Sequence, residues 1–527
     1  MTYSKAMAAV FARQANAEYL IDDVTGRRFN YGDWLALAER MADGLADRGI
    51  GRGDRVAMVL PNCWEFAAFY FACLLRGAAA APINPDLGDE TIEYLISHIA
   101  PGLVLTSTDL VGSLGEALRG QVSCAVEAVV LESVVLETND GDIPAFDPGS
   151  LAEAGGAASA DPWRNVDDEA VFSICFTSGT TERPKGVAHY VGGLLGNATA
   201  FNEVYGFDGG TRMAHYFPMA YMAGFLNTLL SPCMAGGSVL LTGKFGPMTP
   251  LKFWRTLRQH DANTLWVSPT MLSAVMALDR DPDTAEGVGG HIKTICVGTA
   301  PLPASLKTTF EDRYGVTLNE SYGSSELLYI TAVSDSDRQS PGTVGVPLRG
   351  VVARIVDHQG NDQPADHEGE IRLRSDYSFA GYVDYANGRV EPYAAQSWFH
   401  TGDSGHLDPA GRLFVTGRIK DIIIKGGINV SPRAIEEILH RHPQVQHVAV
   451  VGVPHEFFGE DIVAAIVVSE QTPGNSVDLA KELQDICRSR LSEVEVPSRI
   501  EFLKELPLSS TGKVQKAELR RYLANGT

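Results

Sequence analysis

Residues 177–186 read Thr-Ser-Gly-Thr-Thr-Glu-Arg-Pro-Lys-Gly and follow the apolar run 170–176, AVFSICF. The run is short, β-branched and aromatic, which predicts a buried strand. A loop rich in glycine and hydroxyl groups at the end of a strand offers backbone N–H groups, hydroxyls and one ammonium to an anion such as triphosphate. It is not a Walker A loop, because Lys185 precedes the last glycine. An exposed surface turn is the plain structural alternative.

The composition is that of an ordinary globular protein with more than one domain. The chain has 527 residues, of which 45% are hydrophobic and 20% charged, and this length exceeds what one hydrophobic core usually serves. The net charge of -22 disfavours nucleic-acid binding, which needs clustered basic residues.

The seven cysteines show no Cys-x-x-Cys spacing, so we expect buried free thiols in a reducing cytoplasm. The first residues lack the long apolar segment of a signal peptide. The longest membrane-like stretch, 66–75, is too short to cross a bilayer. The sequence therefore predicts a cytoplasmic protein without a membrane span.

Helical and strand patterns alternate in the first part of the chain. Helices are expected over 31–47, 64–76 and 90–99, and strands over 55–60, 79–83 and 102–106. This rhythm predicts a layered α/β domain with a mostly parallel sheet. The segment 137–161, rich in small and polar residues, predicts a loop.

The pattern changes twice in the second part of the chain. Short strands are expected over 351–356, 369–374 and 411–416, which predicts a β-rich subdomain. Beyond Gly417, helices over 432–442 and 477–491 with strands over 445–453 and 462–469 predict a compact α+β domain.

Four further segments carry candidate chemistry, each with a plain structural alternative. Residues 319–326 (NESYGSSE) combine an aromatic ring, a glycine turn and a carboxylate, which suit a base and Mg²⁺, or form a capped turn. Residues 398–403 (WFHTGD) place Asp403 after a glycine turn, where it accepts ribose hydroxyls or nearby amides. Residues 417–421 (GRIKD) indicate a linker or hinge, and Lys513 lies on a glycine-containing loop that by itself suggests only a solvated lysine.

In this order, the five segments resemble the motifs of the adenylate-forming (AMP-binding) superfamily, in particular its acyl-CoA synthetase or acid–thiol ligase branch. Residues 177–186 resemble SGTTGxPKG, 321–326 resemble YGxTE, and 401–403 match TGD; Arg418 and the pair Gly512-Lys513 match the hinge and C-terminal motifs. The resemblance covers nearly the whole chain. It implies a large N-terminal domain of layered α/β sheets plus a β-rich subdomain, residues 1–419, and a small mobile α+β C-terminal domain, residues 420–527, with the hinge at Lys420.

The resemblance also implies the chemistry. A carboxylic acid attacks ATP in the presence of Mg²⁺ to give an acyl-adenylate, and the thiol of coenzyme A then displaces AMP after the small domain has rotated. Positioning and electrostatic stabilisation supply most of the catalysis in such a reaction. Lys513, Thr181 and Glu326 are the expected catalytic residues, and Glu326 is the expected Mg²⁺ ligand.

The remaining site residues follow from the same motifs. The expected ATP-binding residues are Thr177, Ser178, Gly179, Thr180, Thr181, Lys185, Tyr322, Gly323, Ser325, Asp403, Arg418 and Lys513. The expected acyl pocket, apolar and suited to an acyl or aryl group, comprises Tyr221, Met222, Gly224, Phe225, Gly298, Thr299 and Ala300, although each apolar member also suits a plain core. The hinge and coenzyme A segment comprises Lys420, Lys425, Gly426 and Gly427.

Several residues depart from the family pattern. Glu182 replaces a glycine. Repulsion between a carboxylate and a phosphate about 6 Å apart costs on the order of 3 kcal/mol at an effective dielectric near 20. We therefore expect the Glu182 side chain to point outward, paired with Arg183. Lys425 and Ile428 stand where many coenzyme A ligases carry Ser and Glu. Tyr221 stands in place of an aromatic histidine.

Alternatives remain at the level of function. The acyl group could pass to the phosphopantetheine of a carrier protein, or the chain could be a non-catalytic nucleotide-binding relative, against which the intact Lys185, Glu326, Asp403 and Lys513 argue. Luciferase-type oxidation has no supporting residue pattern. The sequence leaves the acid and the oligomeric state open, a dimer included.

Overall fold

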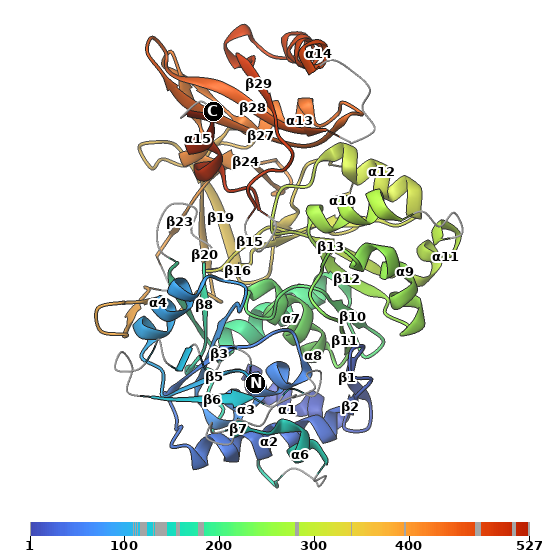
Figure 1. Ribbon diagram of the computed structural model, residues 1–527, viewed down its shortest axis with the longest axis vertical. Helices are drawn as coiled ribbons and strands as arrows, with labels where there is room; N and C mark the ends of the chain where they lie inside the picture. The colour runs from blue at the N-terminus through green and yellow to red at the C-terminus, as the bar shows by residue number, and fades with distance from the viewer. Residues whose placement is uncertain are drawn as a thin grey trace.

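The computed structural model describes residues 2–524 apart from 109, 111, 113, 116–117, 119–123, 130, 132–144, 154–158, 178–183, 280–283, 339, 395–396, 469–475 and 509–512. A large body carries two sheets, and a small C-terminal domain lies above it (Figure 1). The predicted fold class, α/β with a small α+β C-terminal domain, is confirmed.

The first sheet of the body has nine strands in the order β22-β21-β9-β8-β4-β3-β5-β6-β7. The strands from β8 to β7 are parallel, whereas β9 and β21 run antiparallel to their neighbours. The bounds are β3 (Arg55–Val59), β4 (Ala79–Ile83), β5 (Leu103–Ser107), β6 (Ala125–Val129), β7 (Ala145–Phe146), β8 (Val171–Phe176), β9 (Gly186–Tyr190), β21 (Gly381–Val383) and β22 (Val390–Pro392).

Helices cover both faces of this sheet, as expected for a parallel arrangement. Helices α2 (Tyr31–Asp47) and α3 (Trp64–Arg76) pack into the main core, and α4 (Asp89–Ile99) packs into a second cluster. The side chain of Asn30 caps α2 by accepting from the backbone N–H of Asp33 at 2.7 Å. Gly77 ends α3 at φ 75°, a left-handed conformation that favours glycine.

The second sheet has seven strands in the order β14-β13-β12-β10-β11-β1-β2, all parallel except β2. One core cluster contains residues of both sheets and of α7, so the two sheets form one body. The strands are β1 (Glu18–Asp22), β2 (Arg28–Asn30), β10 (Arg212–His215), β11 (Ser238–Leu241), β12 (Thr264–Val267), β13 (Thr294–Val297) and β14 (Leu318–Glu320). The accompanying helices are α1 (Tyr3–Arg13), α7 (Val191–Tyr205), α8 (Ser231–Ala235), α9 (Thr249–Gln259), α10 (Pro269–Leu278), α11 (Thr284–His291) and α12 (Ala304–Tyr314).

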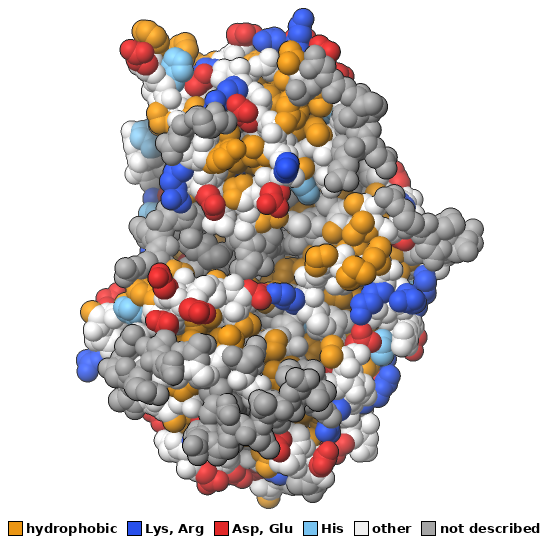
Figure 2. Space-filling model, viewed as in Figure 1, with side chains coloured by type: hydrophobic (Ala, Val, Ile, Leu, Met, Phe, Trp, Pro, Cys, Tyr) orange, Lys and Arg blue, Asp and Glu red, His pale blue; other side chains and the backbone are white. Residues whose placement is uncertain are grey.

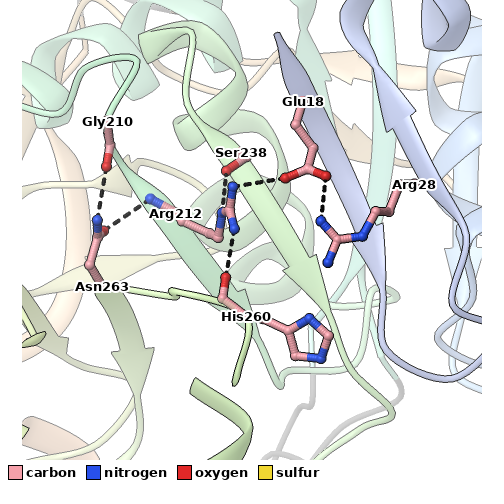
Figure 3. Close-up of polar contacts among 7 residues, drawn as sticks. All are labelled: Glu18, Arg28, Gly210, Arg212, Ser238, His260 and Asn263. Carbon is pink, nitrogen blue, oxygen red and sulfur yellow. Dashed lines mark hydrogen bonds and ion pairs between the residues drawn. The ribbon is translucent and has the colours of Figure 1, made fainter. Parts of the chain in front are cut away.

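Arg212 makes hydrogen bonds to residues at the amino-terminal ends of several strands of this second sheet (Figure 3). Its guanidinium donates to Ser238 Oγ at 3.0 Å, to the carbonyl of His260 at 2.6 Å and to Glu18 Oε2 at 2.8 Å. These partners precede or begin the neighbouring strands, so one side chain fixes the start of several of them. The opposite, carboxyl edge is where open α/β sheets bind their ligands.

A four-stranded antiparallel sheet, β19-β20-β23-β24, lies between the body and the C-terminal domain (Figure 1). Its strands are β19 (Val351–Val356), β20 (Gly369–Ser375), β23 (Phe399–Leu407) and β24 (Leu413–Arg418), which confirms the predicted β-rich subdomain. Two short hairpin pairs precede it: β15 (Gly323–Ser324) with β16 (Leu328–Tyr329), and β17 (Thr331–Ala332) with β18 (Val346–Pro347).

The C-terminal domain is a five-stranded sheet with three helices. Its elements are β25 (Ile423–Lys425), β26 (Ile428–Val430), α13 (Pro432–Leu439), β27 (Val445–His455), β28 (Gly459–Val468), α14 (Ser476–Arg488), β29 (Arg499–Phe502) and α15 (Lys516–Ala524). A single 3₁₀ turn, Ile419–Asp421, joins it to β24. Of the predicted linker 417–421, residues 419–421 form this short connection, whereas Gly417 and Arg418 belong to β24.

The prediction of a loop over 137–161 is wrong in part. Residues 145–146 form β7 and residues 148–153 form helix α6 (Pro148–Glu153). Phe146 lies so close to α2 that a Cβ on Gly44 would be 2.8 Å from its ring. This long-range packing stabilises structure in a segment whose composition favours a loop.

Charged side chains of both signs lie on the surface (Figure 2). On the face drawn in Figure 2, acidic and basic side chains are interspersed, and several basic side chains lie over α9. No helix within the described ranges is both long enough and apolar enough to cross a bilayer. All seven cysteines are free thiols, and each is buried except the half-buried Cys124.

Candidate active site

Asp403 is the centre of a polar group assembled from three separate segments. Residues 403 and 418 pair directly across β23 and β24, and Arg418 Nε lies 3.0 Å from Asp403 Oδ1. The Tyr322 hydroxyl donates to the other oxygen, Asp403 Oδ2. Burial, and then the charge of Asp403, raise the pKa of Tyr322 well above its ordinary value, so Tyr322 is a donor at neutral pH.

The prediction of a glycine turn at residues 401–403 is wrong. These residues lie inside β23, with Gly402 at φ 68°, and the strand continues to Leu407. Pairing with β24 decides this, because it supplies backbone partners that a local pattern does not reveal. The strand conformation also fixes Asp403 opposite Arg418.

Glu326 and the end of the loop 177–186 meet at Tyr382, a residue that the sequence analysis did not identify. The Tyr382 hydroxyl donates to Glu326 Oε1 at 2.9 Å, and Lys185 Nζ lies 5.7 Å from the centre of the Tyr382 ring. Burial, and then the charge of Glu326, raise the pKa of Tyr382. An isolated tyrosine in the short strand β21 carries no signal of chemistry in the sequence.

The described ends of the loop face each other. The backbone N–H of Thr177 donates to the carbonyl of Lys185 at 3.0 Å, and the Lys185 N–H donates to Thr177 Oγ1 at 3.2 Å. Ser178, Gly179, Thr180 and Thr181 lie outside the described residues, as does Glu182, so the expected outward orientation of Glu182 stays a prediction.

Lys513 enters the same site from the C-terminal domain. Its side chain is exposed to water along part of its length, yet surrounding protein lowers its pKa through desolvation, and the charge of Arg418 lowers it further. The carboxylates of Asp403 and Glu326 act in the opposite direction. Residues more than a hundred positions apart thus share one electrostatic environment.

The segment next to Gly323 is tightly packed. A Cβ on Gly323 would lie 2.6 Å from the carbonyl of Leu328, so the pairing of β15 with β16 requires glycine there. Ser325 lies half-buried in the turn between β15 and β16, close enough for its backbone to act on the pKa of His189.

The expected acyl-pocket residues follow the carboxyl ends of two strands of the second sheet, β10 and β13. Tyr221 Oη accepts from Asn84 Nδ2 at 3.1 Å, where Asn84 follows β4. Immediately beyond Met222, residues 223–230 form the π-helix η1 (Ala223–Leu230), a rare conformation often found at functional sites. Phe225 is fully buried and stacks on Tyr70 at 4.0 Å, so its side chain serves the core.

Glycine is required at two positions of this region. A Cβ on Gly224 would lie 2.2 Å from the carbonyl of Pro218, and one on Gly298 would lie 2.8 Å from Trp266 Cζ2. Thr299 has φ 73°, which is unusual for a β-branched residue. Thr299 and Ala300 lie half-buried just beyond β13.

The expected coenzyme A residues Lys425, Gly426 and Gly427 lie on the hairpin of β25 and β26 in the C-terminal domain. Lys425 Nζ pairs with Asp461 Oδ1 at 2.8 Å, and both side chains are mostly buried, so Lys425 stabilises the domain itself. Gly426 and Gly427 form the tip at φ 60° and 82°. Among the predicted ATP-binding residues, the structure brings together Tyr322, Asp403, Arg418 and Lys513.

These side chains suit a nucleotide triphosphate better than a protein-only metal site. Among the described residues no three His, Cys, Asp or Glu side chains are grouped to hold a metal ion. A single carboxylate with substrate phosphates and water is the usual environment of Mg²⁺. Glu326, beside Lys185 and Tyr382, provides that single carboxylate.

Comparison with known proteins agrees with this site. The model of the AMP-binding enzyme family matches residues 7–383, and that of the AMP-binding enzyme C-terminal domain matches residues 434–513. The chain belongs to the AMP-binding enzyme family.

The relatives narrow the class further. The chain is 30% identical over 517 residues to the sulfoacetate–CoA ligase of Cupriavidus necator, covering 98% of this chain and 96% of that protein. It is 29% identical over 508 residues to the long-chain-fatty-acid–CoA ligase FadD13 of Mycobacterium tuberculosis, covering 95% and 94%. Family and relatives together identify an AMP-forming acid–CoA ligase, which uses ATP and coenzyme A.

Solved structures agree on the fold. ATP-bound MatB from Rhodopseudomonas palustris superimposes with a TM-score of 0.86 at 26% identity, covering 100% of this chain and 99% of that one. Apo MatB from the same organism, with the same coverage and identity, gives a TM-score of 0.75.

Proposed function

We propose that the chain activates a carboxylic acid as its acyl-adenylate at the Asp403–Glu326 site and then transfers the acyl group to coenzyme A after rotation of the C-terminal domain. The observation that carries the proposal is the convergence of Tyr322, Asp403, Arg418, Glu326 and Lys513. A non-catalytic nucleotide-binding protein has no need of a lysine brought in from a separate domain.

Each group has a chemical role in the first half-reaction. Asp403, held by Tyr322 and Arg418, is positioned to accept the ribose hydroxyls of ATP. Lys185 and the loop hydroxyls bind the β- and γ-phosphates. Lys513 faces the α-phosphate and the attacking carboxylate, and its positive charge offsets the repulsion between two anions.

Glu326 is the residue that would hold Mg²⁺ in this proposal. When bound with ATP, Mg²⁺ neutralises phosphate charge and favours the departure of pyrophosphate. The hydrogen bond from Tyr382 fixes the orientation of the Glu326 carboxylate.

The second half-reaction uses a different surface in this proposal, the β25–β26 hairpin that carries Lys425, Gly426 and Gly427. Four apolar side chains beside them are exposed: Ile424 (53%), Ile428 (50%), Phe457 (83%) and Phe458 (47%). Rotation about Lys420 would bring this face to the body and bury it, which favours the second arrangement. The chain superimposes better on ATP-bound MatB than on apo MatB, with TM-scores of 0.86 and 0.75, which supports assigning the present arrangement to the ATP-binding step.

The acid belongs to the acyl or aryl class in this proposal. Tyr221 and Met222 lie half-buried beyond the carboxyl end of β10, and the buried Trp266 ring packs directly against Gly298, 2.8 Å from where a Cβ would lie. The relatives act on acids as different as sulfoacetate and long-chain fatty acids. We therefore expect the residues that line this pocket, rather than family membership, to select the acid.

A panel of carboxylic acids tests the proposal. Pyrophosphate release is measured with and without coenzyme A, and mass spectrometry identifies the product. We expect acid-dependent release, an acyl-adenylate without coenzyme A, and an acyl-CoA with it. Release without acyl-CoA would favour a carrier protein as acceptor, and no release with any acid would refute the proposal.

A further inference from the structure

Helix α13 of the C-terminal domain is fixed to the β-rich subdomain at its first turn. The Arg433 guanidinium donates to the carbonyl of Val415, and Ser431 Oγ donates to the carbonyl of Thr416 at 3.3 Å. Both acceptors lie in β24, before Lys420, and both donors follow it. These contacts cross the connection between the two domains, so a rotation about Lys420 would break them.

Arg433 is held in position within its own helix. Its side chain is only 16% exposed, and its Nε pairs with Glu437 Oε1 at 3.2 Å, one turn further along α13. The planar guanidinium can therefore make this pair and the Val415 bond with different nitrogen atoms.

The charge of Arg433 also acts on a buried carboxylate of the body. Glu320 lies at the end of β14, two residues before Tyr322, and pairs with Lys307 Nζ at 3.1 Å. Burial raises the pKa of Glu320, and the charges of Lys307 and Arg433 counteract that effect. Only Arg433 among these groups belongs to the C-terminal domain.

A second contact lies at the other end of α13. His440 Nδ1 lies 3.2 Å from Ser305 Oγ, and Ser305 is in the first turn of α12 of the body. Helices α12 and α13 face each other across the domain boundary (Figure 1). An eight-residue helix is about 12 Å long, so contacts at both ends fix its direction as well as its position.

We propose that Arg433, assisted by the His440–Ser305 contact, is a positioning residue that holds the C-terminal domain where Lys513 meets Asp403 and Glu326. Arg433 then supports adenylation and has no part in thioester formation. The inference rests on the proposed function, because it assigns the two half-reactions to two domain arrangements.

The test compares Arg433→Ala, Arg433→Lys and Ser305→Ala with Arg490→Ala, an exposed arginine on the same domain. Adenylation is followed as acid-dependent exchange of pyrophosphate into ATP. Thioester formation is followed separately from chemically prepared acyl-adenylate and coenzyme A. Thermal unfolding shows whether each variant is folded.

We expect Arg433→Ala to lower the kcat of adenylation about 10- to 100-fold, with the KM for ATP changed less than about threefold, because the fraction of correctly placed domains falls. Thioester formation stays within about twofold of the unsubstituted enzyme, and Arg433→Lys recovers part of the loss. Ser305→Ala acts in the same direction with a smaller effect. An equal fall of both half-reactions, or an unchanged adenylation rate, would overturn the inference.

Hydrogen exchange separates this inference from the proposed function. In Arg433→Ala, the first turn of α12 and the strand β24 should exchange faster than in Arg490→Ala, whatever acid is used. If no acid supports pyrophosphate exchange, the proposed function fails while this comparison still tests the contact. Equal exchange in the two variants would refute the positioning role of Arg433.

Discussion

Replacement of Lys513 by alanine should separate the two half-reactions. Two opposite unit charges about 4 Å apart interact by about 4 kcal/mol at an effective dielectric of 20. Because part of the Lys513 side chain is exposed to water, we expect a loss of about 3–4 kcal/mol in transition-state stabilisation, or roughly 10²–10³ in the adenylation rate. Thioester formation from supplied acyl-adenylate should be spared.

The assay measures acid-dependent pyrophosphate exchange and, separately, the reaction of prepared acyl-adenylate with coenzyme A. Lys504→Ala, an exposed lysine on the same domain, serves as the matched control. An equal fall in both half-reactions for Lys513→Ala would refute the role assigned to this lysine, and so would a loss below threefold.

The pH profile gives a second readout of the same residue. Desolvation and then Arg418 lower the pKa of Lys513, so its ammonium is lost at a lower pH than that of an ordinary lysine. The adenylation kcat/KM should therefore fall as pH rises through this lowered pKa, and Lys513→Ala should lack that alkaline limb. Bound ATP, an anion, should move the limb of kcat to higher pH.

Two further predictions concern stability and the acid pocket. Burial lowers the pKa of His189 to about 4 and that of His215 to about 3. Both imidazoles stay neutral in the folded protein but take up a proton in the unfolded chain below about pH 6.5. The free energy of unfolding therefore falls as the pH is lowered from about 6.5 to about 4, by about 3 kcal/mol for His189. His189→Gln should remove about half of this acid slope in urea midpoints measured across pH, and an unchanged slope would contradict the assignment. Gly298→Ala places a Cβ 2.8 Å from Trp266. It should raise the KM for the acid at least tenfold and leave the KM for ATP within twofold, whereas Gly290→Ala, whose added Cβ would meet no atom within 4 Å, should change neither KM. Equal effects of the two variants would contradict an acid pocket at Gly298.

Local patterns predicted many elements to the residue. The helices Tyr31–Asp47 and Trp64–Arg76 and the strands Ala79–Ile83 and Val351–Val356 have the expected bounds. Their periodicity, caps and terminal glycines are all encoded within the element itself. The motif residues Asp403, Glu326 and Lys513 were recognisable for a similar reason, because each lies in a short motif and these motifs occur along the chain in the order typical of the family.

Other features depend on contacts between distant segments. The strand through Asp403, expected as a turn, follows from pairing with β24, and helix α6 follows from packing in a segment that favours a loop. Tyr382 joins Glu326 to Lys185 only because β21 lies beside β9 in the nine-stranded sheet. Strand register places such residues, and no local signal announces it.

The sequence by itself determined the family, the chemistry-bearing residue types and most of the elements that carry them. The tertiary structure decided which of those residues meet: Arg418 opposite Asp403, Tyr322 on the same carboxylate, and Lys513 brought in by the C-terminal domain. The physical reason is that side-chain distances across domains depend on how whole sheets and helices pack. The contacts of α13 through Arg433 and His440 belong to that packing.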